Sequence, residues 1–211
     1  MRVRRGHARA AILVAATRLF EENGFSATSI DDIASAAGVA RPTVFTAVGG
    51  KASILGEAID LALAGDSEQV PVSRREWFLQ MINEPGQARM LELHARNLRA
   101  MYERVADLYV AAEHAATVDP TVAELWETMQ SQRLLGAQEV SSSLASKGPL
   151  REGMDAQSVA DILWCVATPM NYRRFVRERG WTSERYERWL AEFMITSFLP
   201  NPQESGRQRS R

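Results

Sequence analysis

The chain of 211 residues carries a formal net charge of −1 at pH 7, and 45% of its residues are hydrophobic. This length allows a small domain and a larger one, and the composition is ordinary for a globular protein. No stretch reaches the ~20 apolar residues of a membrane span. The apolar run near the N-terminus is too short, and too soon followed by charges, for a signal peptide.

Charge and cysteine content bear on partners and compartment. Residues 1–51 hold seven Arg and Lys against four Asp and Glu, a balance of +3, so the remaining residues carry −4. This asymmetry places a positive field on an N-terminal module, where it favours contact with nucleic-acid phosphates. Cys165 is the single cysteine and cannot form an intramolecular disulfide, so we expect a reducing, cytoplasmic compartment.

The first predicted element is a helix over residues 8–23, which has Gly24 just past its end. We expect residues 1–7, with Arg4 and Arg5, to form a basic arm in front of it. A second helix begins at Ser29, which can cap it while Asp32 reaches back, as in a capping box.

Residues 33–51 are the segment most informative about function. Two short helices can cross around a small apolar core made by Ile33, Ala34, Ala37, Val39 and Val44. Gly38 between them tolerates the left-handed backbone of a sharp turn. This is the helix-turn-helix pattern, whose second helix can enter a DNA major groove. Alanine-rich helical proteins produce similar spacing by chance, so a structural helical hairpin is the alternative.

The order ATRLFEENGFSATSIDDIASAAGVARPTVFTAVGGKASIL resembles the DNA-binding domain of the TetR family of bacterial transcription regulators. The family usually has an aromatic pair and a phenylalanine where this chain has Phe45, Ala47 and Val48, and a serine cap where it has Ala40. Two phosphate contacts of the family are therefore expected to be missing here. Affinity for DNA then depends more on Thr43, Thr46, Lys51 and the basic arm.

From the residues and the resemblance together, we expect a set of DNA contacts. Arg41 can hold a guanine edge by two hydrogen bonds, although a phosphate contact or a solvated side chain is an alternative. Lys51 stands at a helix N-terminus, where a cation and backbone N–H groups can jointly hold phosphate. For Thr43 and Thr46 the alternative is a bond within the helix, and for Ser29 it is capping alone. The full set is Arg4, Arg5, Thr28, Ser29, Arg41, Pro42, Thr43, Thr46, Ala47 and Lys51.

A helix from residue 51 is expected to link this domain, residues 8–52, to a larger helical domain over residues 67–200. Asp119 and Asp155 are placed to cap two of its helices, and Pro169 should break the second of these. The helices are predicted over residues 74–82, 87–116, 120–146 and 155–179, and the last one over residues 186–198 after a turn at residues 180–183. The polar tail, residues 201–211, is expected to be disordered.

Methionines and aromatic residues in the larger domain suit a core, but also a cavity for an apolar ligand. The resemblance implies an effector pocket among these helices. Arg133 is costly to bury alone, so it should pair with an acid such as Glu113 or Asp161, meet an anionic ligand, or lie at a rim. The expected lining of the effector pocket is His94, Met101, Tyr102, Tyr109, Trp126, Met129, Arg133, Trp164 and Met170.

The resemblance also implies a homodimer in which the last two helices of each protomer form a four-helix interface. Two recognition helices related by a two-fold axis can read a palindromic operator. The alternative is that the aromatic stripe packs inside its own protomer. The expected interface residues are Val159, Ile162, Tyr186, Trp189, Leu190, Phe193 and Phe198.

Catalytic and metal chemistry have little support. His7, His94, His114 and Cys165 lack metal-ligand spacing, and the serines at 141–143 have no attendant base. We expect no cofactor and no membrane contact. The sequence therefore predicts an all-α protein with a three-helix DNA-binding domain and a larger ligand-binding and dimerisation domain: a regulator, most often a repressor, released from DNA by a mostly apolar small molecule. The alternative is a helical small-molecule-binding or interaction protein that keeps the fold but has lost operator binding.

Overall fold

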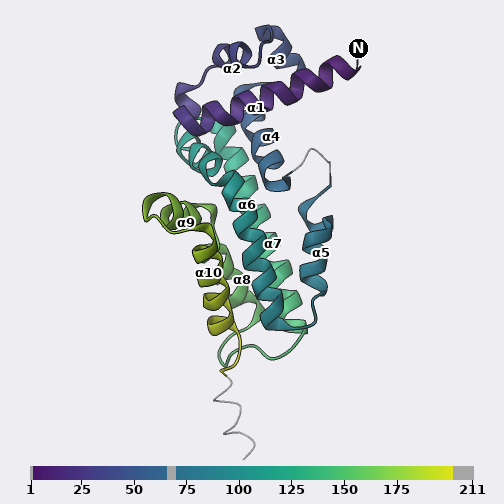
Figure 1. Cartoon of the computed structure of the whole chain (residues 1–211), viewed down its shortest axis with the longest axis vertical. Coiled ribbons are helices and arrows are strands. Elements are labelled where there is room, and N and C mark those ends of the chain that lie inside the picture. The colour runs from purple at the N-terminus through teal and green to yellow at the C-terminus, as the bar shows by residue number, and fades with distance from the viewer. Residues whose placement is uncertain (1, 66–69, 202–211) are drawn as a thin grey trace, which may run out of the picture. The chain divides into compact units, whose positions relative to one another are not determined.

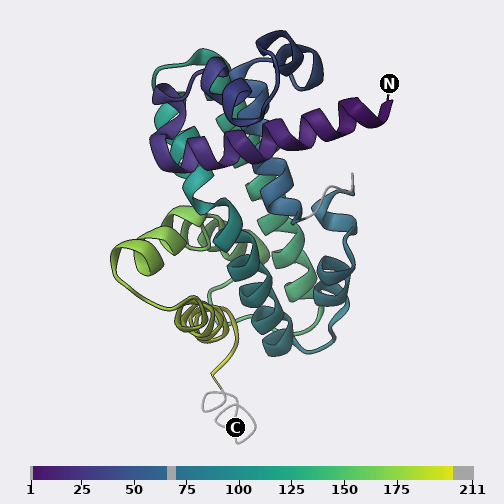
Figure 2. The ribbon, with the colours of Figure 1, turned by 45° about the horizontal axis from the view of Figure 1, so that its top comes forward.

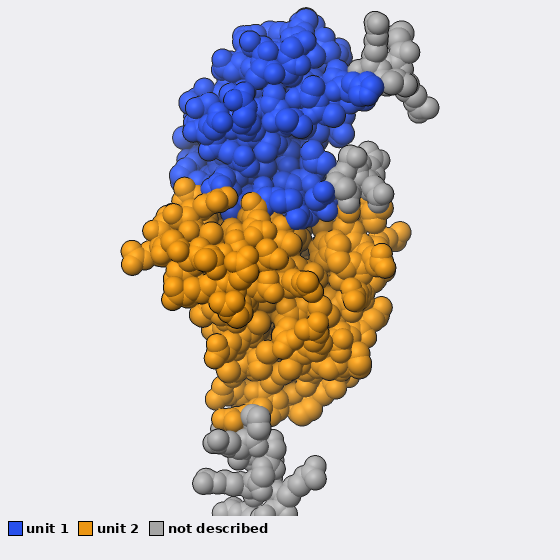
Figure 3. All heavy atoms as spheres, viewed as in Figure 1, with its two compact units in different colours: residues 1–68, 104–129 blue, residues 69–103, 130–211 orange. Residues whose placement is uncertain are grey.

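The computed structural model describes residues 2–65 and 70–201, with side chains from Gly6 onward. Helices and their connections account for both ranges, and no strand occurs within them (Figure 1). The predicted all-α fold class is confirmed. The chain divides into two compact units, which are coloured separately in Figure 3.

The first unit contains Met1–Glu68 and Arg104–Met129. Its N-terminal helices are α1 (Arg2–Ala27), α2 (Ile30–Ala36), α3 (Arg41–Ala47) and α4 (Lys51–Ala64). Helix α1 packs against each of the other three, and α2 and α3 lie next to each other (Figure 2). The core between these helices is fully or almost fully buried and consists of Ile12, Leu13, Ala16, Phe20, Ile33, Val44, Ile54 and Leu55.

Helix α1 differs from the prediction at its start. Its helical backbone begins at Arg2, so residues 2–7 continue the helix instead of forming a separate arm. Its end agrees better, because Gly24 breaks the helical path with φ 77° and ψ 170°, a conformation that favours glycine. Turns at Gly38, with φ 65°, and at the start of α4 also follow the prediction.

The two compact units divide the chain differently from the predicted functional domains, whose boundary near residue 67 stays a prediction. The C-terminal part of α6 (Gln87–Ala116) and the N-terminal part of α7 (Pro120–Ser146) belong to the first unit. Arg104 gives one physical reason, because its guanidinium donates hydrogen bonds of 2.7 and 3.2 Å to the carbonyls of Ala62 and Leu63 at the end of α4. A cation at a helix C-terminus also opposes the negative end of the helix dipole.

The second unit contains Gln69–Glu103 and Gln130–Arg211. Besides the remaining parts of α6 and α7 it has η1 (Val72–Arg74), α5 (Glu76–Asn83), α8 (Ala156–Val166), α9 (Pro169–Arg173), the π-helical turn η2 (Arg174–Glu178) and α10 (Ser183–Phe198). Asp155 caps α8 and Pro169 begins a new helix, as predicted. Asp119 caps α7 by accepting hydrogen bonds from the next two backbone N–H groups after Pro120. The tail predicted to be disordered lies, except for Asn201, outside the described residues.

None of the helices in residues 2–65 and 70–201 is both long and apolar enough to cross a membrane. No group of three or more His, Cys, Asp or Glu side chains within these ranges could hold a metal ion.

Candidate nucleic-acid interface

Helix α2 is fixed at its start by the capping box that the sequence predicts. The Ser29 hydroxyl oxygen accepts a hydrogen bond from the Asp32 N–H at 3.1 Å, and the Asp32 carboxylate accepts from the Ser29 N–H at 2.9 Å. The Ser29 hydroxyl also donates to Asp32 at 2.6 Å, and these bonds lower the pKa of that carboxyl group. Capping therefore accounts for the position of Ser29, and its predicted DNA contact stays a prediction.

Helix α3 is anchored by one residue and turns the rest of its surface outward. Val44 is 0% exposed, whereas Phe45 is 48% exposed. Arg41, Pro42 and Thr46 are also exposed, and Thr43 and Ala47 are half-buried. The prediction did not include Phe45, although it stands one helical turn after Arg41 and next to the buried Val44. That spacing alone places it on the face of Arg41.

Two groups hold the side chain of Arg41. Its Nη1 atom donates to a carboxylate oxygen of Asp31 at 2.5 Å, and its guanidinium carbon lies 5.8 Å from the centre of the Phe45 ring. Both members of the ion pair are more than half exposed. The side chain is thus at the surface of the motif, where a guanine edge could reach it.

Two threonines use their hydroxyl protons within the chain. Thr46 donates to the carbonyls of Pro42 and Thr43, both at 3.1 Å, which is the local bond considered as the alternative. Thr28 is only 2% exposed and donates to the carbonyls of Gly24 and Leu19. The prediction that the Thr28 side chain contacts phosphate is therefore wrong, because the hydroxyl is buried and occupied.

Lys51 also has a different setting from the one expected. Its ammonium group donates to the carbonyls of Phe25 at 2.9 Å and Thr28 at 3.0 Å. It lies 4.1 Å from the centre of the Phe25 ring, which adds a cation–π interaction. The side chain is half-buried, so its first role is to tie the start of α4 to the connection between α1 and α2.

Two further basic residues of the first unit, Arg9 and Arg18, form ion pairs with acidic side chains. Arg9 pairs with Glu57 at 2.9 Å and Arg18 with Glu22 at 3.7 Å. Residues 1–64 contain seven Arg and Lys against six Asp and Glu, so the favourable balance found for residues 1–51 almost disappears. The side chains of Arg4 and Arg5 lie outside the described residues.

The residues expected to line an effector pocket fall into both units. Tyr109, Trp126 and Met129 belong to the first unit, where the two rings meet edge to face with centres 5.8 Å apart. His94, Met101, Tyr102, Arg133, Trp164 and Met170 belong to the second. The Tyr102 hydroxyl donates to the carbonyl of Ala167 at 2.6 Å. His94 is half-buried, and burial lowers its pKa to about 4. The pocket itself stays a prediction.

Arg133 has hydrogen-bond partners other than an acid, and pairing with an acid was one of the three settings expected for it. It donates to the side chain of Gln130 at 2.6 Å and to the carbonyls of Trp164 and Ala167 at 2.8 and 3.3 Å. Its guanidinium also lies 5.7 Å from the centre of the Trp164 ring. The expected pairing with Glu113 or Asp161 is corrected: carbonyls at the end of α8 take that place, where a cation is favoured.

Four of the seven expected interface residues are buried inside their own unit. Val159, Tyr186, Leu190 and Phe198 are 0% exposed, so direct contact with a second protomer is wrong for them. In α8 and α10 these residues lie on the helix faces that are buried in the core. The other three, Ile162, Trp189 and Phe193, are half-buried and keep some accessible surface.

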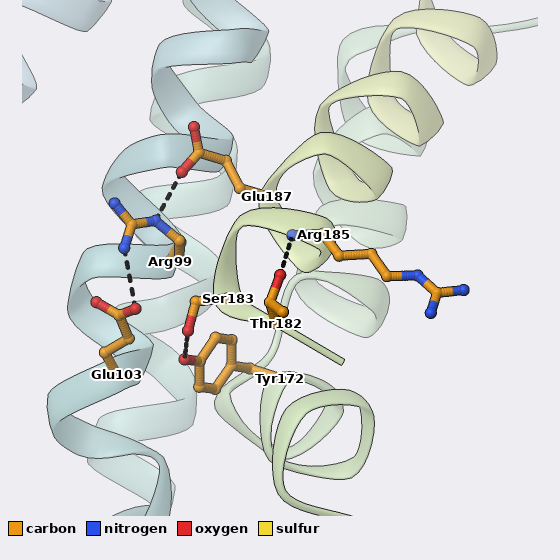
Figure 4. Close-up of polar contacts among 7 residues, drawn as sticks. All are labelled: Arg99, Glu103, Tyr172, Thr182, Ser183, Arg185 and Glu187. Carbon is orange, nitrogen blue, oxygen red and sulfur yellow. Dashed lines mark hydrogen bonds and ion pairs between the residues drawn. The ribbon is translucent and has the colours of Figure 1, made fainter. Parts of the chain in front are cut away.

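Helix α10 is also held by polar contacts, which Figure 4 shows. Arg99 on α6 pairs with Glu187 at 2.6 Å and Glu103 at 2.9 Å, and Tyr172 shares a hydrogen bond of 2.9 Å with Ser183. A groove of about 650 Å³ lies along α6 and α10 and is lined by four Arg and four Glu side chains, besides Leu93, Ala191 and Ile195. This charged lining differs from the apolar pocket that the sequence predicts.

Comparison with known proteins gives matches to bacterial regulators. Residues 12–58 match the family model described as bacterial regulatory proteins, tetR family. The matched range contains most of α1 and all of α2 and α3. The chain is 29% identical over 168 residues to the uncharacterized HTH-type transcriptional regulator YdeS of Bacillus subtilis (strain 168). This alignment covers 79% of the chain and 77% of YdeS.

Solved structures with low sequence identity share the fold. One is a proposed transcriptional regulator from Saccharomonospora viridis in complex with choline, with a TM-score of 0.68, 18% identity, and coverage of 93% of this chain and 100% of that one. Another is NalD, the secondary repressor of the MexAB-OprM multidrug efflux pump in Pseudomonas aeruginosa. Its TM-score is 0.66 at 21% identity, with coverage of 91% of this chain and 95% of NalD.

Proposed function

Because the chain belongs to the tetR family of bacterial regulatory proteins, we propose that it is a homodimeric repressor of transcription that leaves its operator when a small molecule binds. The observation that carries this proposal is the outward face of α3. Val44 fixes the helix to the core, while Arg41 and Phe45 remain exposed one helical turn apart. A short helix with such a face can enter the major groove and meet base edges.

The two exposed side chains suit different bases. The N–H donors of Arg41 match the O6 and N7 acceptors of guanine, and the ring of Phe45 matches the methyl group of thymine. Pro42, Thr43, Thr46 and Ala47 complete the face of α3 that we propose to lie against DNA. We place the phosphate contacts at Ser29 and at the arginines of the first turns of α1, Arg4 and Arg5.

A dimer is proposed through α8 and α10. Ile162, Trp189 and Phe193 are the members of the predicted interface that keep accessible surface. Apolar side chains that are half-buried in one protomer can become fully buried against a second, as in obligate dimers. Two copies of α3 then face successive turns of one DNA groove and read a palindrome.

The effector is proposed to be a mostly apolar small molecule bound in the larger domain. Buried aromatic and methionine side chains of the second unit, such as Tyr102 and Met90, support an apolar ligand. The S. viridis regulator of the same fold is in complex with choline, which supports a small-molecule effector in general. NalD, of the same fold, is a repressor, which supports release from DNA as the response. Such a ligand must bind the free and the DNA-bound conformations with different affinity, or it shifts nothing.

A mobility-shift experiment on genomic fragments at several salt concentrations tests this proposal. We expect a small set of fragments to stay bound at salt concentrations that release all others, because specific binding retains base contacts after phosphate contacts weaken. Binding that disappears from all fragments together as salt rises would instead favour an interaction protein that keeps the fold without reading an operator.

A further inference from the structure

The carboxylate of Asp31 stands beside the side chain that we propose to read guanine. Asp31 lies in the first turn of α2 and Arg41 in the first turn of α3, and their charged atoms are 2.5 Å apart. The side chains are 63% and 55% exposed, so neither is needed to fill the core. The contact joins the two helices of the motif at their outer surface.

The pair leaves most of the guanidinium available. Only Nη1 donates to Asp31, and the described part of the chain offers no other hydrogen-bond acceptor to the guanidinium. A guanidinium has five N–H donors in a planar fork, so the edge formed by Nη2 and Nε can still meet two acceptors. Guanine presents two such acceptors, O6 and N7, in the major groove.

The ring of Phe45 restricts the same group from another side. The guanidinium carbon lies 5.8 Å from its centre, and the ring is 48% exposed. A carboxylate and a ring together limit the orientations of a long side chain before DNA arrives. Binding then costs less conformational entropy than it would for a free arginine.

We propose that Asp31 is a positioning residue that sets the base preference of Arg41. Resting on the function proposed above, this inference assigns Asp31 a role in operator choice. The Asp31–Arg41 pair is neutral as a whole, so it offers no net attraction to a phosphate. Guanine is itself neutral and gains two hydrogen bonds from the oriented arginine. The pair therefore favours the correct base over unspecific phosphate binding.

The substitution D31N tests this in the full-length protein. Asparagine has nearly the same shape but removes the charge that fixes Arg41. Preference for guanine at one position of each half-site should fall by about tenfold. Affinity for an unrelated duplex should rise, with a salt dependence steeper by about one phosphate contact. Circular dichroism checks that the helices persist, and Asp31→Ser provides the same readout should D31N fail to fold.

A matched control and a double variant complete the experiment. E22Q removes one acid from another exposed ion pair of the same unit, Arg18–Glu22, and should leave base preference unchanged. In an R41A background, D31N should no longer affect the guanine position, because the arginine that it positions is gone. An additive effect of the two substitutions would overturn the proposal.

Failure of the proposed function and failure of the role of Asp31 give different experimental results. If the wild-type chain selects no DNA sequence, the proposed function itself is lost. If the wild type selects a sequence and the folded D31N protein has the same base preferences, the function stands and the role of Asp31 does not.

Discussion

Lys51 has a structural role in its own unit, whatever it contributes to DNA binding. Its ammonium group satisfies two backbone carbonyls and rests on an aromatic ring, all contributed by the segment from Phe25 to Thr28. Charged hydrogen bonds of this kind contribute more than neutral ones, and carbonyls left without a donor are costly. The start of α4 is therefore fixed relative to the turn that leads into α2.

Replacing Lys51 by methionine should lower the free energy of unfolding by about 1–3 kcal/mol, since the partly buried carbonyl of Thr28 loses its donor and that of Phe25 retains only the N–H of Thr28. Urea denaturation followed by circular dichroism measures this change. Lys51→Arg, which retains a charge and donors, is the matched control and should lose less. If the methionine variant kept wild-type stability and only weakened DNA binding with a smaller salt slope, Lys51 would be a phosphate ligand after all.

His94 gives the protein a pH dependence of stability. Burial lowers the pKa of its imidazole to about 4 in the folded chain, compared with 6.5 in the unfolded chain. Between these values the unfolded chain binds the proton and the folded chain does not, so stability falls as pH decreases from 6.5 towards 4. The loss attributable to this group is at most about 3 kcal/mol.

His94→Gln should flatten the stability profile between pH 6.5 and 4, as measured by thermal unfolding at fixed ionic strength. His114→Gln is the matched control, because that histidine is exposed and its replacement should retain the wild-type profile. An unchanged profile in the His94 variant would mean that carboxyl groups alone cause the acid sensitivity.

At the scale of elements, helix bounds could be predicted from sequence wherever the signals are local. Both bounds of α6 and α7 and the C-terminal end of α10 follow from apolar periodicity and from caps such as Asp119, which act within a few residues. Roles that depend on distant segments could not be predicted. Lys51 meets a carbonyl 26 residues away, and Arg133 meets one 31 residues away. The periodicity of apolar residues predicts helices, but it does not predict contacts between segments that are far apart in the chain.

The dimer face illustrates the same limit. The aromatic stripe of α10 was visible in the sequence, but a stripe does not say which side chains face inward. Tyr186, Leu190 and Phe198 are buried in their own unit, and only part of the stripe keeps accessible surface. The candidate DNA face was easier, because a motif of fixed geometry determines which positions of α3 point outward.

Replacing Ile162 and Phe193 together by glutamate should give a monomer that loses operator binding, because charges cannot be buried unpaired in an apolar interface. Analytical ultracentrifugation measures the mass, and circular dichroism checks the helical content. Phe193 also contacts Trp189 within the protomer, with ring centres 5.8 Å apart. Ile162→Glu alone therefore provides a variant that leaves this ring contact in place.

A variant that remains dimeric and folded would place the interface elsewhere. In that case the charged groove along α6 and α10 becomes the next surface to examine.

At the scale of the whole molecule, the proposal links a ligand to DNA binding. A ligand that binds only the folded chain raises the melting temperature, and one that favours the DNA-free form releases the operator. Screening apolar compounds by thermal shift, then adding each hit to a DNA complex, measures both effects. Trp126→Ala should weaken release while leaving ligand-free DNA binding intact. Hits that stabilise the protein but never release DNA would contradict this coupling.

Selection of bound duplexes from a random DNA library tests most directly whether the chain reads a sequence. We expect enrichment of a palindrome whose half-sites are about one helical turn, 10–10.5 base pairs, apart, with a guanine in each half-site that depends on Arg41. A library that shows no enrichment after repeated rounds, with folded protein and low salt, would contradict the assignment of this chain as a sequence-specific regulator.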